Sequence, residues 1–341
     1  MARRIGGLMD WKSGYSSTYY AYIVDSVSWR ETDRLEITGG NINRTDAGLR
    51  DSADIECTGY SGRETYIRVY LDTKQAGETV HEPMFTGLAT SPSRDIKGNY
   101  ETQTLECFSV LKAADDVLLQ RGYYVPAGLD SARAITDLLS IIPAPIEVEG
   151  AAPGLQMSII AEDGETRLSM ADKILTAIGW RMRIRGDGTV VLAPRPTDAA
   201  AQFDPLDHDV LEPSINIDYD WFECPNVFRA VMDDLSAVAR DDDPDSPLST
   251  VSRGREVWAE ETSCDLNTGE SISEYAARRL KELQAVRLTA RYSRRYDPGV
   301  LVGDLVHLRY PAQGLDGLYR VTSQSVELSY GASTTEEVEA V

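Results

Sequence analysis

The segment Val286-Arg-Leu-Thr-Ala-Arg-Tyr-Ser293 opens the part of the chain that decides its fold. Apolar and polar residues alternate along it, and a period of two places one set of side chains on each face of a β-strand. A turn at Asp297-Pro-Gly299 follows, and Val300-Leu-Val-Gly-Asp-Leu-Val-His-Leu308 predicts a second strand with a bulge or bend at Gly303-Asp304. Two further strands are predicted at Leu318–Ser323 and Ser325–Tyr330. Short strands joined by Gly and Pro turns are typical of an antiparallel sheet or a small barrel.

The first third of the chain shows the same alternation. In Thr65–Leu71, for example, Ile67, Val69 and Leu71 share one face of the expected strand. Gly39-Gly40 reads as a turn between two strands. Strands are predicted at Ser16–Val24, Leu35–Thr38, Ile55–Thr58, Thr65–Leu71, Met84–Ala89 and Tyr100–Phe108. Residues 1–108 are therefore expected to form an N-terminal β-barrel-like domain.

The apolar period changes to that of a helix after Ser109. A first helix is expected over Val110–Leu118, and a second begins at an Asp130-Ser131 cap. A third helix begins near Thr166, with Gly179 just past its end. Strict alternation then predicts a β-hairpin from Trp180–Arg185 to Thr189–Leu192. Residues 109–198 are expected to form a small α+β domain.

The rest of the chain, residues 199–341, is expected to form a second β-barrel-like domain. The stretch Asp198–Pro213 resembles a linker in composition, and an insertion with a capped helix is expected at about 232–285. In Ser271-Ile-Ser-Glu274 the hydroxyl and the carboxylate have the spacing of a capping box. The segments near 205–265 and 286–335 are expected to pair within the barrel. The predicted fold class is mainly β with α+β parts.

Charge and hydropathy restrict the function classes. The chain of 341 residues has 55 acidic and 34 basic residues, a net charge of −21, and a pI near 4.6. Such a chain repels a phosphate backbone, so specific nucleic acid binding is not predicted. The charge fits plain solubility, or a surface past which DNA moves without binding. No apolar run approaches the ~20 residues of a membrane segment, and no signal peptide is expected at the N-terminus.

The sequence shows no pattern of reactive or metal-binding side chains. Its four cysteines and three histidines are scattered without metal-ligand or triad spacing, and structural disulfides are not expected. The acidic run Asp241–Asp245 lacks the alternating ligands of a calcium loop. Glu260 and Glu261 are adjacent and would point to opposite faces of a strand. No catalytic residue, cofactor or metal site is predicted, and the expected role is not enzymatic.

Three stretches together resemble phage tail (baseplate) hub proteins, the family found in long-tailed phages and contractile injection systems. The first is Tyr296-Asp-Pro-Gly-Val-Leu-Val-Gly-Asp-Leu-Val-His-Leu308, followed by Gly317-Leu-Tyr-Arg-Val-Thr-Ser323, which is similar to the terminal barrel of that family. Leu105–Asp116 is similar to its junction between a strand and a helix. Gly164–Trp180 is similar to its helix that leads into a short hairpin.

The resemblance implies a structural protein at the tail tip. It implies a homotrimeric ring that joins the hexameric tail tube to a three-fold spike or fibre and lets DNA or cargo pass. The implied partners are a tail tube or distal tail protein above, and a spike, fibre or tape-measure protein at the tip. The implied location is the virion tail tip (baseplate), after assembly in the host cytoplasm. The chain ends about ten residues after its last predicted strand, so the C-terminal lytic domain of many relatives is not expected.

Two other function classes stay open at this point. One is a non-viral β-rich module that binds carbohydrate or acts in adhesion, which would need a secretion signal. The other is a cell-wall hydrolase, which would lose activity when a single carboxylate is changed. The Arg185-Gly-Asp187 sequence fits an adhesive motif, but a tight turn also requires Gly and Asp.

Five arginines are candidates for subunit or partner contacts. They lie on the predicted hairpin and on the strand quoted first: Arg181, Arg183, Arg185, Arg287 and Arg291. Arginine pairs with carboxylates in a planar, two-pronged geometry, which suits interfaces of an acidic protein. The alternative is that these side chains are simply solvated.

Overall fold

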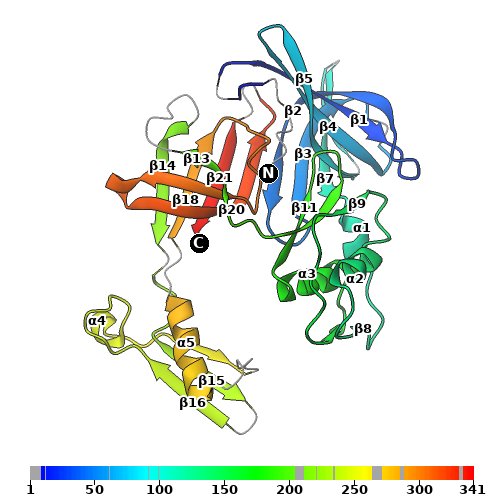
Figure 1. Ribbon diagram of the computed structural model, residues 1–341. Helices are drawn as coiled ribbons and strands as arrows, with labels where there is room; N and C mark the ends of the chain where they lie inside the picture. The colour runs from blue at the N-terminus through cyan, green and yellow to red at the C-terminus, as the bar shows by residue number, and fades with distance from the viewer. Residues whose placement is uncertain are drawn as a thin grey trace. The chain divides into compact units, whose positions relative to one another are not determined.

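The computed structural model describes residues 9–11, 13–60, 62–90, 92–98, 100–203, 211–219, 221–232, 235–262, 271–284, 288–329 and 333–341. The chain divides into two compact units, one of residues 1–215 with 291–339 and one of residues 216–290. Strands dominate, so the predicted fold class, mainly β with α+β parts, is confirmed (Figure 1). In the described part of the chain, no helix is both long and apolar enough to cross a membrane.

Six strands near the N-terminus close into a barrel. Their order is β1-β4-β5-β7-β3-β2, and the pairing of β1 with β2 completes the ring. The barrel interior is apolar and includes Ile67, Val69, Phe85 and Leu105. The strands are β1 (Ser16–Val24), β2 (Glu31–Thr45), β3 (Asp51–Thr58), β4 (Thr65–Gln75), β5 (Glu78–Ala89) and β7 (Tyr100–Ser109), while β6 (Ser93–Lys97) pairs with β7 alone.

The long strand β2 corrects the predicted turn at Gly39-Gly40. Its pairing with β3 shifts register between Ile37 and Gly39, which marks a bulge rather than a turn. Before the bulge β2 pairs with β1, and after it Asn41–Thr45 pair with β20. Gly40 has a φ of +133°, and a Cβ there would lie 2.1 Å from the Asp54 carbonyl oxygen. Only glycine fits where this strand changes its neighbour.

The second set of strands continues the same sheet, so the two expected barrels are not separate. β20 pairs with β2 on one edge and with β21 on the other, and the order then runs β21-β18-β14. β19 pairs with the first half of β20, and β13 runs parallel to β19. These strands are β13 (Ala199–Phe203), β14 (Leu211–Tyr219), β18 (Leu288–Arg294), β19 (Leu305–Tyr310), β20 (Leu315–Glu327) and β21 (Thr334–Ala340), with the short 3-10 helix η1 (Pro311–Gln313) between β19 and β20.

Several predicted boundaries in this region are wrong. β19 begins at Leu305 rather than Val300, because residues 300–304 form a turn in which Gly303 has a φ of +83°. The two strands expected at 318–323 and 325–330 are one strand, β20, since the polar Gln324 between them is buried and hydrogen bonded. The linker expected at 198–213 contains β13 and the start of β14. Residues 286, 287 and 330, which fall within predicted strands, lie outside the described residues.

The prediction for the C-terminal segment is also wrong. It was expected to follow the last strand, but residues 334–340 form β21 inside the sheet. The sequence of this strand is polar and rich in acid, so it lacks the usual apolar signal. Its inward residues Thr334, Glu336 and Val338 are nevertheless fully buried.

Residues 109–198 form the α+β part. The first predicted helix is only one turn, α1 (Lys112–Asp115), whereas the second and third lie where expected, as α2 (Ser131–Leu138) and α3 (Arg167–Ala177). Asp130 and Thr166 cap them, each accepting a hydrogen bond from the third residue on. The predicted hairpin is present as β11 (Trp180–Ile184) and β12 (Val190–Pro194), and β9 (Ile146–Val148) pairs parallel to β12. β8 (Tyr124–Val125) and β10 (Ile159–Ile160) form a separate short pair.

The second unit has its own small sheet and core. Strand β15 (Val227–Met232) lies between β16 (Leu235–Arg240) and β17 (Trp258–Glu261), so these segments do not join the large sheet as expected. Helix α5 (Ile272–Gln284) lies over one face of this sheet (Figure 1). Its buried residues Tyr275, Ala276 and Leu280 form a core with Phe228 and Ala230 of β15. A one-turn helix, α4 (Thr250–Arg253), lies between β16 and β17. The unit spans residues 216–290, which is wider than the insertion expected at about 232–285.

Candidate functional site

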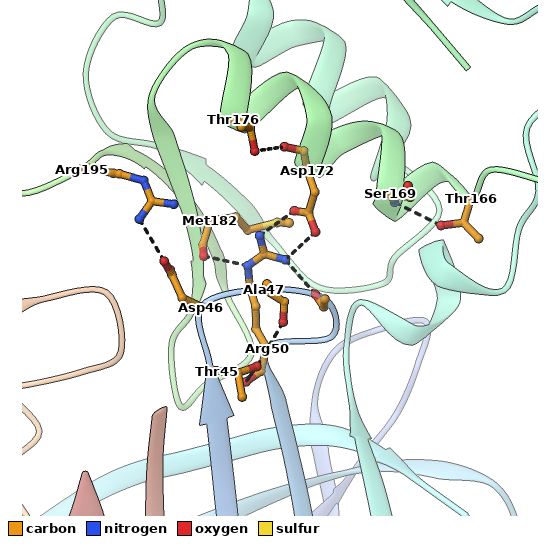
Figure 2. A network of polar contacts seen from close by, with 11 residues as sticks. Thr45, Asp46, Ala47, Arg50, Thr166, Ser169, Asp172, Thr176, Met182 and Arg195 are labelled. Atoms are coloured by element: carbon orange, nitrogen blue, oxygen red, sulfur yellow. Dashed lines mark hydrogen bonds and ion pairs between the residues drawn. The ribbon is translucent and has the colours of Figure 1, made fainter. Parts of the chain in front are cut away.

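The turn between β2 and β3 holds the α+β part through one arginine. Arg50 is buried and has a φ of 64°, a left-handed conformation that is rare outside glycine. Figure 2 shows its guanidinium between α3 and β11. It donates to Asp172 Oδ1 at 2.5 Å and to the carbonyl oxygen of Met182 at 2.9 Å. A two-pronged contact of this kind fixes direction as well as distance.

The same turn takes part in a second ion-paired cluster. Asp46 pairs with Arg195, the residue after β12, with 2.9 Å between Oδ2 and Nη1 (Figure 2). Nearby, Arg181 of β11 pairs with Asp304 at 2.9 Å, and both side chains are almost fully buried. A Cβ on Gly303 would come within 2.9 Å of the Arg181 guanidinium, so glycine lets these groups approach. One polar junction thus joins the N-terminal barrel, the α+β part and the turn before β19. It consists of the ion pairs Arg50–Asp172, Arg195–Asp46 and Arg181–Asp304.

The turn of the β11–β12 hairpin docks on the outside of the N-terminal barrel. Arg68 of β4 donates to the Asp187 carbonyl oxygen, and the Thr86 hydroxyl donates to the Gly186 carbonyl oxygen at 2.7 Å. A Cβ on Gly186 would lie 1.7 Å from the Pro83 carbonyl oxygen. The Arg-Gly-Asp sequence is therefore a packed turn, which removes the structural basis for an adhesive motif there.

A chain of buried polar side chains links the two sets of strands. Arg44 of β2 donates to Gln324 of β20 at 2.6 Å, and Gln324 donates to Glu336 of β21 at 2.8 Å. Glu336 receives two hydrogen bonds from Arg294 of β18, and neither of these two side chains has any exposed surface. None of these four residues was predicted from the sequence. Each of them interrupts the apolar side of its strand, which is the signal that a search for buried ion pairs would use.

Two carboxyl groups beside this chain have raised pKa values. Burial raises the pKa of Asp51 to about 6, against the opposing effect of Arg44 and Arg50. Burial also raises the pKa of Glu82 to about 7, opposed by Arg44 and reinforced by Asp187. Within the described ranges no cluster of His, Cys, Asp or Glu has the geometry of a metal site.

The predicted contact arginines have different surroundings. Arg181 is buried against Asp304 of the same chain, so its acidic partner is internal. Arg183 and Arg185 are partly exposed and pair with Glu149 and Glu147. Arg291 is exposed, and Arg287 lies outside the described residues. A role in subunit contact stays a prediction for Arg183, Arg185, Arg287 and Arg291.

The sequence matches no known protein-family profile and no curated protein. Solved structures do match over nearly the full chain. A tail protein from Neisseria meningitidis MC58 aligns with a TM-score of 0.63 and 18% identity, covering 96% of both chains. The 43 kDa tail protein of prophage MuSo2 from Shewanella oneidensis aligns with a TM-score of 0.64 and 14% identity, covering 96% of this chain and 98% of that one.

The same fold occurs within a longer chain. A chain of the Francisella PdpA–VgrG complex aligns with a TM-score of 0.59 and 8% identity, covering 96% of this chain and 58% of that one. The resemblance to tail hub proteins seen in the sequence is confirmed at the level of the fold. Identities this low carry the fold alone.

Proposed function

We propose that this protein is a structural hub at the tip of a phage tail or of a related injection apparatus. Three copies would form a ring that joins a hexameric tail tube to a three-fold spike or fibre, with a central passage for DNA or cargo. Its partners would be a tube or distal tail protein above and a spike, fibre or tape-measure protein below. The ring would assemble in the host cytoplasm and lie at the tail tip of the virion.

The observation that carries this proposal is the strand order around the β2–β20 pair. β2 has β1 on one edge and β3-β7-β5 on the other. β20 has β19 on one edge and β21-β18-β14 on the other. Each long strand changes partner along its length, pairing first within its own set and then with the other long strand. Two related sets of strands per chain would give six around a three-fold axis, which suits a six-fold partner.

The fold comparison supports the same role. The aligned solved structures are described as tail proteins, and the alignment covers nearly all of both chains. The polar groups of the junction also favour a structural role, since Asp172 and Asp304 are each paired with an arginine of the same chain. We therefore propose that the protein has a structural role in an assembly and not a catalytic one.

Mass in solution tests the proposal. Three chains of 37.6 kDa have a combined mass of roughly 113 kDa. Light scattering of the purified full chain, over a hundredfold range of concentration, should reach this value. A mass of one chain throughout, unchanged when the tube protein of the same particle is added, would overturn the ring.

A further inference from the structure

Three charged side chains point into the interior of the N-terminal barrel. Arg44 of β2 and Asp51 of β3 are cross-strand partners, and Glu82 of β5 is the partner of Leu71 in β4. Partners across a pair of strands share one face of the sheet. Leu71 and Ala53, which lies two residues after Asp51, belong to the apolar barrel interior. Arg44, Asp51 and Glu82 therefore lie on the inner side of the barrel rather than on its outer face.

The guanidinium of Arg44 binds neither carboxyl group. It donates to Gln324 Oε1 at 2.6 Å and to the Met84 carbonyl oxygen at 2.5 Å. Gln324 is also the register partner of Arg44, so this contact ties β2 to β20. Asp51 is buried and Glu82 half-buried, and among the described residues neither carboxyl group has a hydrogen bond or an ion pair. Burial without such a partner favours the protonated form of a carboxyl group.

The charges around the two carboxyl groups act in opposite directions. They come from four elements: Arg44 of β2, Arg50 of the turn before β3, Asp187 of the β11–β12 turn and Tyr296 of the segment before β19. Burial outweighs the arginines, so the pKa of Asp51 rises to about 6 and that of Glu82 to about 7, the latter with a contribution from Asp187. The stability that these protons contribute is full below about pH 4 and is lost as the pH rises through 6 and 7.

We propose that Arg44, Asp51 and Glu82 form a proton-sensitive latch, which holds β2 to β20 while the two carboxyl groups are protonated. When both lose their protons, two negative charges in the barrel attract the Arg44 guanidinium away from Gln324. Local opening of the β2–β20 pair then lets water reach the carboxylates, which relieves the cost of burying them. Because this pair joins the two sets of strands, its opening frees the sets to move relative to each other. The latch lies within one chain and is independent of the proposed ring.

Amide hydrogen exchange of the full chain between pH 5 and pH 8 tests the latch. After correction for the intrinsic pH dependence of exchange, the opening constant along the pairing of Asn41–Thr45 with β20 should rise roughly a hundredfold, since each unit of pKa shift contributes up to tenfold. Glu82→Gln and Asp51→Asn imitate the protonated groups, so each should reduce the rise about tenfold and the double variant should remove it. Glu78→Gln is the matched control, since Glu78 is an exposed glutamate of the same strand, and it should leave the rise unchanged.

The pairing of β1 with β4 in the same barrel is the internal reference. If its amide groups open with the same pH dependence, the protons stabilise the whole barrel and there is no latch at β2–β20. A wild-type opening constant that does not change with pH overturns the inference without any variant, so the test stands even if a variant fails to fold. A rise that persists in the double variant, or that disappears in Glu78→Gln, assigns the effect to other groups and overturns it as well.

Discussion

Arg294 and Glu336 show that the position of a charged residue within its strand can predict a buried ion pair. Arg294 shares a strand face with the buried residues Ala290 and Tyr292, and Glu336 shares one with Val338. A charge on the apolar side of a strand predicts a buried ion pair or a functional group. The sequence offers both halves of this pair. It does not show that β18 lies beside β21, because pairing between distant strands is decided by the whole sheet.

Removing one partner of this pair should be costly. Glu336→Gln leaves the Arg294 guanidinium buried without a counter-charge, so the free energy of unfolding should fall by about 3 kcal/mol or more. Urea denaturation measures the change. Glu101→Gln is the control, since the Arg94–Glu101 pair is exposed to solvent and should contribute far less to stability. Equal losses for the two variants would contradict the buried pair.

The raised pKa of Asp51 predicts a dependence of stability on pH. Its folded pKa of about 6 is above the ordinary value of 3.8, so folding favours the protonated carboxyl. That contribution is full below about pH 4 and is lost as the pH rises through about 6. The free energy of unfolding of the wild type should therefore fall by on the order of 3 kcal/mol between pH 4 and pH 8 because of this group. Asp51→Asn should not show this fall, so its stability relative to the wild type should rise by the same amount. Denaturant titrations at both pH values check this, and no such gain is expected for Asp54→Asn, at an exposed position of β3.

At the scale of the elements, the bulge in β2 sets the course of the large sheet. Gly40→Ala would place a methyl group 2.1 Å from the Asp54 carbonyl oxygen at a φ of +133°. We expect a loss of roughly 3 kcal/mol or more in the free energy of unfolding. Gly77→Ala is the control: its φ is +89° but nothing lies within 4 Å, so only about 1–2 kcal/mol of backbone strain is expected. A thermal melt in which Gly40→Ala is no worse than Gly77→Ala would refute this account of the bulge.

The capping box of α5 gives a smaller and local prediction. The Glu274 amide donates to the Ser271 hydroxyl at 3.3 Å, and the Ser271 amide donates to the Glu274 carboxylate at 2.8 Å. Ser271→Ala should cost on the order of 1 kcal/mol of stability in the second unit. Ser273→Ala, an exposed change in the first turn of the same helix, should cost less. A melt without any shift for Ser271→Ala would show that the cap does not stabilise the helix.

These elements also show which parts of the fold a sequence can predict. Helices α2, α3 and α5 begin where their caps predict, because capping depends on residues three positions apart. The hairpin of β11 and β12 is equally local. Strand β21 was missed because it is stabilised by distant partners and not by its own composition. The bulge at Gly39-Gly40 was mistaken for a turn because its cause is the neighbouring β20.

At the scale of the whole molecule, the polar junction explains why the N-terminal barrel, the α+β part and the second set of strands form one unit rather than three separate domains. Arg50, Arg181 and Arg195 each bind an acid from another part of the chain, and the β2–β20 pairing joins the two sets of strands. The sequence left two alternatives for the arginines of β11, contact with an acidic neighbour or simple solvation. It did not reveal that the acid facing Arg181 is internal, since Asp304 lies 123 residues away.

The net charge limits how copies can assemble. A ring of three copies carries three times −21, or −63. Burying an unpaired acid between subunits costs several kcal/mol, so most acids must stay at solvent surfaces, including the wall of a central passage. An acidic wall would repel DNA phosphates and let DNA slide without binding. Arg291, and Arg287 outside the described residues, remain our predicted contacts near the subunit interfaces.

Direct imaging of the purified assembly tests the central claim most directly. Electron-microscopic class averages viewed down the symmetry axis should show a three-fold ring with a central hole and six similar lobes, two from each chain. Single compact particles, or rings in which each chain contributes one lobe, would contradict the account.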